Sequence, residues 1–264
     1  MEYVLSLSYG KDSLACLGAI EQLGLPLDRI VHAEVWATDS IPADPPPMVE
    51  FKKKADEIIL QRYGIPVEHI RSKWTYESHF YRIRSPKAKN AGMIYGFPMQ
   101  RGSWCVGRLK TEVINQMNKG VVSMLGIASD EPERVERHIK KPNVILPLVE
   151  AGWTEAMCRK WCEDNDLLSP IYTTAARGGC WFCHNQGVDQ LRLLRRNYPD
   201  LWNQLLKWDA DSPVTFRPDG HMVHDFDRRF QMEDKGLIPT GRTFRWEMLD
   251  NPPFIWSGEQ MSLF

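Results

Sequence analysis

The chain has 264 residues, of which 43% are hydrophobic and 25% charged, and its formal net charge is −1. This composition predicts a soluble globular protein of one large domain, or one domain with an appendage. The balanced charge gives no overall signal for nucleic-acid binding, and no apolar run reaches the ~18 residues of a membrane span. The first residues lack the basic segment of a signal peptide. We therefore expect a cytoplasmic protein without membrane contact, whose six cysteines are thiols or metal ligands rather than disulfides.

The first predicted strand leads into a short polar turn and then a helix. Residues 3–7 are mostly apolar and favour a strand, and residues 14–20 are apolar with good helix formers. Between them lies the turn Ser8-Tyr9-Gly10-Lys11-Asp12-Ser13. Such a turn directs backbone N–H groups, hydroxyls and a helix N-terminus at one point, which attracts phosphate. An ordinary polar turn that caps a helix is the alternative interpretation.

The order Ser-x-Gly-x-Asp-Ser differs from the Walker loop, which is longer and ends in Gly-Lys-Ser/Thr. It resembles the pyrophosphate-binding loop of ATP pyrophosphatases. Those enzymes split ATP between the α and β phosphates and adenylate an oxygen of their substrate. Their loop usually reads Ser-Gly-Gly-x-Asp-Ser, so Tyr9 replaces one glycine. We expect Tyr9 to adopt a backbone angle that a residue other than glycine can reach.

The pattern of the following residues predicts alternating strands and helices. A strand over 29–37, a helix over 48–63 and a strand over 67–71 extend the first unit to β-α-β-α-β, which implies a parallel sheet with right-handed crossovers. Residues 72–103 are irregular and are interpreted as an insertion over the carboxyl edge of the sheet. Further elements are predicted as a helix over 108–119, strands over 121–127 and 144–148, a helix from Thr154 to about Asn165, and helical structure over 187–207.

These elements predict an α/β fold with a doubly wound, mostly parallel, Rossmann-like sheet. We expect a nucleotide hydrolase domain over 1–185 and a small, mostly helical or irregular C-terminal extension over 186–264. Ligands of such sheets bind beyond the carboxyl ends of the strands, so the loops after strands one, two and four should share a cleft. Thr38 and Asp39 follow the second strand, and Asp130 follows the fourth. For Asp39 or Asp130 alone, a solvated turn carboxylate is the simpler interpretation.

Cys180-Trp181-Phe182-Cys183 forms a Cys-x-x-Cys pair preceded by two glycines. Such a pair lets two thiolates approach one metal, and the glycines allow a tight turn. A redox pair or two buried thiols are the alternatives. A tetrahedral site needs two more ligands.

We predict Cys105 and Cys158 as these further ligands. Cys105 precedes a predicted helix, and Cys158 lies near the start of another helix, close to the end of strand five. Cys162 lies one turn further along that helix, and His184 is a rival ligand beside Cys183. Cys16 is most simply a core thiol of the first helix.

Four segments together resemble the phosphoadenylyl-sulfate (PAPS) reductase-like family of the adenine nucleotide α-hydrolase superfamily. They are the loop, Trp-Cys-x-x-x-Leu-Lys at 104–110, Gly-x-x-x-Asp-Glu at 126–131 followed by Arg134, and Gly-Cys-Trp-Phe-Cys at 179–183. The resemblance covers residue 1 to about residue 190. Relatives with such cysteines often hold a [4Fe-4S] cluster, although the spacing alone equally allows zinc. Four cysteine ligands would favour a cluster that braces the fold, and three would favour one that carries sulfur.

Two departures separate this chain from the sulfonucleotide reductases. Those enzymes carry a reactive cysteine near the C-terminus, whereas the last cysteine here is Cys183. They also tend to lose the second half of the pyrophosphate loop, whereas this chain keeps Gly10, Asp12 and Ser13. Both features favour the use of ATP.

The resemblance implies a reaction in which MgATP binds at the loop and a substrate oxygen attacks the α phosphate. Pyrophosphate leaves, and sulfur then displaces AMP. The predicted catalytic residues are Lys11, Asp12, Asp130 and Arg134. The predicted nucleotide-binding residues are Ser8, Tyr9, Gly10, Lys11, Asp12, Ser13, Thr38 and Asp39. The predicted metal ligands are Cys105, Cys158, Cys180 and Cys183.

The expected partners are an adenine nucleotide, an acceptor that is a nucleic acid or a small molecule, and a sulfur donor protein. The alternative functions are a sulfonucleotide reductase that uses an external thiol and a nucleotide-sensing or nucleic-acid-binding module without turnover. Lys52-Lys53-Lys54 and the basic residues of 82–89 are interpreted as solvated faces rather than phosphate tracks.

Overall fold

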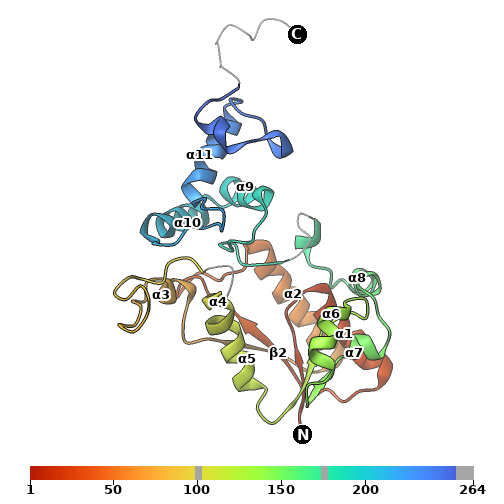
Figure 1. Cartoon of the computed structure of the whole chain (residues 1–264). Helices are drawn as coiled ribbons and strands as arrows, with labels where there is room; N and C mark the ends of the chain where they lie inside the picture. The colour runs from red at the N-terminus through yellow and green to blue at the C-terminus, as the bar shows by residue number, and fades with distance from the viewer. Residues whose placement is uncertain (99–102, 174–177, 254–264) are drawn as a thin grey trace, which may run out of the picture. The chain divides into compact units, whose positions relative to one another are not determined.

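A computed structural model describes residues 1–98, 103–173 and 178–253 (Figure 1). The chain forms two compact units. The first comprises Met1–Arg82 and Arg101–Cys183, and the second comprises Ile83–Gln100 and His184–Phe264. The described residues 83–98 therefore group with the C-terminal part of the chain, whereas the sequence pattern places them in the N-terminal domain.

The first unit is built on five parallel strands in the order β3-β2-β1-β4-β5. Their bounds are β1 (Tyr3–Ser6), β2 (Arg29–Glu34), β3 (Val67–Arg71), β4 (Val122–Leu125) and β5 (Val144–Ile145). The predicted α/β class and parallel sheet are confirmed. The central strand β1 pairs with β2 on one side and β4 on the other, so the strand order reverses there. In open α/β sheets this switch point is where ligands bind.

Helices cover both faces of this sheet. The helices of the first unit are α1 (Lys11–Leu23), α2 (Pro46–Tyr63), α3 (Tyr76–Phe80), α4 (Trp104–Val106), α5 (Glu112–Met117), α6 (Pro132–Ile139), α7 (Pro147–Glu150) and α8 (Glu155–Asp164). On one face, Leu5 of β1 packs in a core built with α1, α2 and α8. On the other face, Val4 and Val31 pack with Met117 of α5. This arrangement follows from the alternation of side chains along a strand that is buried on both faces.

Several boundaries differ from the predicted ones for local reasons. The fifth strand ends at Ile145 rather than 148 because Pro147 begins helix α7, and proline suits the first turn of a helix. The helix predicted over 108–119 begins earlier, at Trp104, and contains a π-helical turn over Gly107–Thr111. Gly18 allows helices α1 and α8 to approach closely. A Cβ at this position would lie only 2.4 Å from the indole nitrogen of Trp161.

The second unit is mainly helical, with α9 (Val188–Asn197), α10 (Pro199–Asp211) and α11 (Val223–Asp234). The helical region predicted over 187–207 is thus two helices, separated before Pro199. Short 3-10 turns cover Gly241–Thr243 and Trp246–Leu249. The buried carboxylate of Asp209 accepts hydrogen bonds from the backbone N–H groups of Val223 (2.8 Å) and His224 (3.0 Å), which caps α11. Within the described ranges, no helix has the length and apolar character needed to cross a bilayer.

Candidate functional site

The loop between β1 and α1 closes on itself through two serines. The Ser13 hydroxyl accepts hydrogen bonds from the Ser8 backbone N–H (3.1 Å) and the Ser8 hydroxyl (2.9 Å). It donates to the carbonyl of Gly10 (3.0 Å). Gly10 precedes α1 in an extended conformation and supplies no side chain to cap the helix. The loop therefore holds a fixed shape at the carboxyl end of the central strand.

The first amide of α1 is capped from elsewhere in the chain. The backbone N–H of Lys11 donates a 3.0 Å hydrogen bond to the hydroxyl of Tyr172. Tyr172 lies in the 3-10 turn Pro170–Thr173. The sequence pattern did not indicate this residue, because the contact joins positions 161 residues apart.

Tyr9 occupies the loop position that is usually glycine, and its backbone lies in the left-handed region with φ +57°. A non-glycine residue reaches this region at a cost of about 1–2 kcal/mol. The side chain is fully buried, and its hydroxyl contacts Asp56 and lies 3.1 Å from His69. Tyr9 therefore adopts an angle that residues other than glycine reach only at this cost, and its buried hydroxyl has hydrogen-bond partners in Asp56 and His69.

His69 links Tyr9 to two carboxylates. Hydrogen bonding to Asp56, and then to Glu34, raises the pKa of His69 to about 9. The same contact with His69 is the main cause that lowers the pKa of Glu34 to about 2. At neutral pH a charged imidazolium is therefore held between two carboxylates beneath the loop.

Three carboxylates meet at the start of α1. Oxygen atoms of Asp12, Glu131 and Glu155 all lie within 4.8 Å of one another. The Lys11 ammonium lies 2.8 Å from Asp12 and 3.1 Å from Glu155. Burial raises the pKa of Asp12, against the opposing effect of Lys11. Oxygen ligands of this kind are those that Mg²⁺ prefers.

This carboxylate group differs from the predicted catalytic set. Asp130 is exposed and accepts a 3.0 Å hydrogen bond from the backbone N–H of Glu155, so it caps the start of α8. Its neighbour Glu131 faces Asp12 instead and also binds the guanidinium of Arg134 (2.6 Å). Glu155 follows the helix-capping Thr154. An acidic residue in the first turn of a helix is common and does not by itself indicate a binding site. Sequence patterns therefore gave no signal that it reaches the loop.

A close backbone approach positions this acidic turn. A Cβ on Gly126, which follows β4, would lie 2.6 Å from the Cα of Ser13 and 2.7 Å from its nitrogen. Only glycine fits this contact between the loop and the segment after β4. The glycine of the Gly-x-x-x-Asp-Glu segment is thus required by packing against α1.

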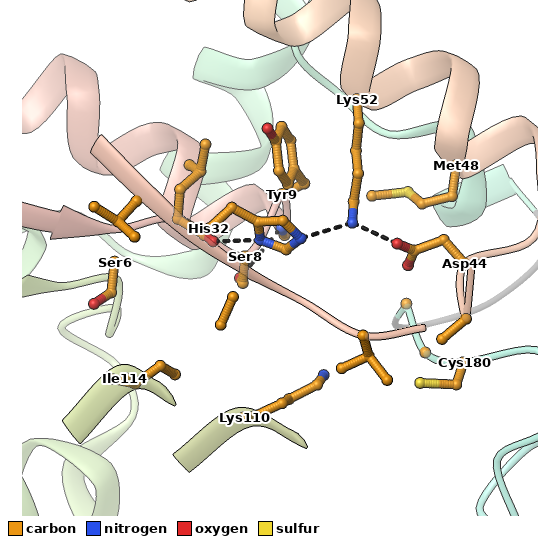
Figure 2. A pocket seen from close by; sticks show the side chains of 18 of the residues that line it. Ser6, Ser8, Tyr9, His32, Asp44, Met48, Lys52, Lys110, Ile114 and Cys180 are labelled. Carbon is orange, nitrogen blue, oxygen red and sulfur yellow. Dashed lines mark hydrogen bonds and ion pairs between the residues drawn. The ribbon is translucent and has the colours of Figure 1, made fainter. Parts of the chain in front are cut away.

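A cavity of about 350 Å³ extends from the loop across the carboxyl ends of β1 and β2. Its size lies at the lower end of small-molecule pockets. Ser8 lines one part, and Lys110 and Cys180 line another (Figure 2). Gly10 of the loop also belongs to the lining. The loop and one cysteine of the Cys-x-x-Cys pair therefore face the same space. Lys110 belongs to the π-helical turn before α5.

The predicted residues after β2 lie apart from this lining. The Thr38 hydroxyl accepts hydrogen bonds from the backbone N–H groups of Ser40 (3.3 Å) and Ile41 (3.0 Å) and so stabilises its own turn. Asp39 is exposed. Val35 and Ala43 line the cavity in their place.

Three of the four predicted metal ligands influence one another. Burial raises the pKa of Cys105 to about 11, and the nearby Cys183 thiolate adds to the rise. Burial likewise raises the pKa of Cys180 to about 12, with Lys110 opposing and Cys183 and Cys105 adding to the shift. The buried hydroxyl of Tyr76 is also affected by all three cysteines. Cys105, Cys180 and Cys183 are called the turn cysteines below.

Cys158 has different surroundings from the turn cysteines, and the four-cysteine site stays a prediction. Its fully buried sulfur belongs to the core beneath the loop, where burial and then Asp12 raise its pKa to about 12. Cys162 lies in the same core, and its thiol donates to the carbonyl of Lys11 (3.3 Å). Helix α8 packs against α1, and both of its cysteines lie in the core of the first unit. His184, the rival ligand, belongs to the second unit, and its buried Nε2 has no hydrogen-bond partner among the described residues.

The spacing of the turn cysteines bears on the kind of metal site. No three cysteine sulfur atoms of the described chain lie within 4.8 Å of one another. Thiolates on a single tetrahedral zinc lie ~3.8 Å apart, given Zn–S bonds of ~2.3 Å. A cluster bound through different iron atoms does not need so close an approach. The three sulfur atoms are therefore not arranged as a preformed tetrahedral zinc site.

No model of a known protein family matches this chain, and no curated protein matches it. The fold and site define an α/β protein with a closed polar loop at its switch point and a cavity that joins this loop to a cysteine turn. The geometry of this site therefore supplies the functional argument.

Proposed function

We propose that this protein is an ATP pyrophosphatase of the PAPS reductase-like type, which adenylates an oxygen of its substrate in order to replace that oxygen by sulfur. The observation that carries the proposal is the Ser8–Ser13 loop, closed by the two serines at the switch point of a parallel sheet. Its backbone N–H groups and hydroxyls suit the β and γ phosphates of ATP.

The charged groups beside the loop suit the ion that accompanies ATP. Asp12, Glu131 and Glu155 would hold Mg²⁺, which neutralises phosphate charge and orients the phosphates for attack. Lys11 now neutralises two of these carboxylates. With the metal ion in that role, the Lys11 ammonium would turn to the phosphates.

The reaction proceeds in two substitutions. An acceptor oxygen forms a bond to the α phosphorus as the bond to the β-phosphate oxygen breaks, and pyrophosphate leaves. A sulfur nucleophile then bonds to the acceptor carbon as AMP departs with the original oxygen. A nucleic acid or a small molecule is the acceptor class, and a sulfur donor protein would supply the nucleophile. The turn cysteines face the same cavity through Cys180, which favours sulfur transfer over simple adenylation.

The turn cysteines would hold a [4Fe-4S] cluster, with zinc as the alternative. Such a cluster would supply a thiophilic iron for sulfur. Three cysteine ligands leave one position for another group, which favours a sulfur-carrying role over a purely bracing one. Lys110, which opposes the rise that burial causes in the pKa of Cys180, favours the thiolate form that metal ligation requires.

The test is the position at which ATP is cut. Protein incubated with MgATP labelled in the α phosphate should release labelled AMP together with pyrophosphate. Asp12→Ala should lower this rate at least about 100-fold because it removes a metal ligand, while the melting temperature stays near that of the parent. Asp164→Ala, which changes an exposed carboxylate of α8, is the matched control. Release of ADP and phosphate, or no detectable ATP binding, would overturn the proposal.

A further inference from the structure

Lys52 is the first residue of a lysine run that the sequence pattern assigned to a solvated face. Its side chain is instead buried, with 6% of the residue exposed, whereas Lys53 and Lys54 are exposed. The difference follows from helical geometry, because Lys52 lies on the face of α2 that also buries Met48 and Ala55. A lysine is almost never this buried unless its charge has partners.

Two groups hold the Lys52 ammonium in place (Figure 2). It donates to Nε2 of His32 at 2.8 Å and forms an ion pair with Asp44. It also lies 5.1 Å from the centroid of the Tyr9 ring. The ammonium group thus contacts side chains of β2, of the segment before α2 and of the loop.

His32 can act only as an acceptor towards Lys52. Its Nδ1 lies 2.8 Å from the carbonyl oxygen of Leu7, so Nδ1 carries the proton and Nε2 has the free lone pair. Burial, and then the charge of Lys52, lower the pKa of His32 to about 3. The imidazole therefore stays neutral and leaves the positive charge of Lys52 intact.

One donor of Lys52 is left for a ligand. An ammonium has three N–H groups, and His32 and Asp44 take two of them. Within the described ranges no third protein partner is found. Lys52 lines the cavity together with Ser8 and Gly10 of the loop, so the remaining donor can serve a group bound beside the loop.

We propose that Lys52 binds the α phosphate of the nucleotide and stabilises the negative charge that grows there during adenylyl transfer. This inference rests on the proposed function. The loop and its carboxylates suit the β and γ phosphates, and Lys52 is the buried cation in the adjoining cavity wall. A donor fixed before the reaction stabilises developing charge without having to reorganise.

The first experiment compares binding of the two products. In Lys52→Met, the Kd for AMP should rise at least about tenfold, because a hydrogen bond to a charged group is lost, whereas the Kd for pyrophosphate should stay within twofold. The rate of AMP formation from ATP should fall by about 100-fold. Lys53→Met, one residue along the same helix, should match the parent in all three measurements. Equal AMP affinity in Lys52→Met and the parent would overturn the inference.

A second experiment needs no substitution and so does not depend on how a variant folds. With the parent protein saturated with Mg²⁺ and pyrophosphate, AMP should bind at least about tenfold more tightly than adenosine. Equal affinities would mean that no α-phosphate contact exists apart from the loop, and would overturn the inference. Failure of the parent to bind pyrophosphate or ATP at all would instead reject the proposed function, so the two failures are distinct.

Discussion

The turn cysteines and the cysteines beneath the loop differ in their surroundings. Cys105, Cys180 and Cys183 are partly exposed and include a residue that lines the cavity, and Cys183 adds to the raised pKa of the other two. Cys158 and Cys162 are fully buried between α1 and α8. A thiol becomes a metal ligand when its thiolate is accessible and stabilised, whereas an apolar interior favours the neutral thiol. Exposure and neighbouring groups, which spacing along the chain does not reveal, therefore set the two groups of cysteines apart.

The largest expected effect separates these two groups by metal content. Cys105→Ser, Cys180→Ser and Cys183→Ser should each lower bound metal by more than about tenfold, because the ligands act together. Cys158→Ser and Cys162→Ser should keep the metal content of the parent while lowering stability. The visible spectrum and metal analysis of protein purified without oxygen provide the measurement. Loss of metal in Cys158→Ser with an unchanged melting temperature would restore it as a ligand.

A second substitution should affect the Ser8–Ser13 loop and leave the turn cysteines unchanged. Gly126→Ala places a methyl group against the backbone of Ser13, which should destabilise the protein by about 1–3 kcal/mol and weaken pyrophosphate binding. Metal content should remain that of the parent, because the turn cysteines lie elsewhere. Gly107→Ala, where no atom lies within 4 Å of the added carbon, is the control. Thermal melting and titration with pyrophosphate distinguish the two variants.

The imidazolium beneath the loop predicts a pH dependence. The folded-state pKa of His69 is about 9, above the unfolded value of ~6.5. Its contribution to stability is therefore fully present below pH ~6.5 and is lost as pH rises through about 9. The melting temperature of the parent should fall between pH 7 and pH 9.5 more steeply than that of His69→Gln. Parallel curves for the two proteins would show that this pair of contacts does not stabilise the fold.

The smallest expected effect is the absence of sulfite formation from phosphoadenylyl sulfate. With thioredoxin and phosphoadenylyl sulfate, the purified protein should form no sulfite above the background of a Cys180→Ser, Cys183→Ser double variant. The reason is that no cysteine follows Cys183 to attack the sulfate sulfur. Sustained sulfite release by the parent would favour the reductase alternative and assign the turn cysteines a redox role.

The strand–loop–helix start and the parallel sheet could be predicted because they depend on local patterns. Apolar runs of fixed period specify the strands, and the Ser8–Ser13 turn is contiguous in the chain. Glu155 and Tyr172 could not be found in this way, since each reaches the loop only through folding of a distant segment. The burial of Lys52 could not be predicted, because a run of three lysines does not reveal which one faces inward.

The surroundings of Cys158 could not be predicted for a related reason. Its position near the end of strand five predicts a place close to the cysteine turn, but α8 packs on α1 and this side chain lies in the core. Helix orientation is set by tertiary packing, which a one-dimensional pattern does not contain. The sequence likewise does not indicate that Glu131, rather than Asp130, faces Asp12. Adjacent residues in a turn can face opposite directions.

The hydrogen bond from the Lys11 amide to the Tyr172 hydroxyl makes anion binding at this loop an exchange of partners. An anion that accepts the Lys11 N–H displaces a phenol oxygen rather than water. The free energy of binding would then reflect the difference between two hydrogen bonds, and a phosphate would bind less tightly than the donors of the loop alone would allow. In the proposed reaction, the phenol would satisfy the same amide again once pyrophosphate leaves, so that the helix end is not left unpaired and release of the product is favoured.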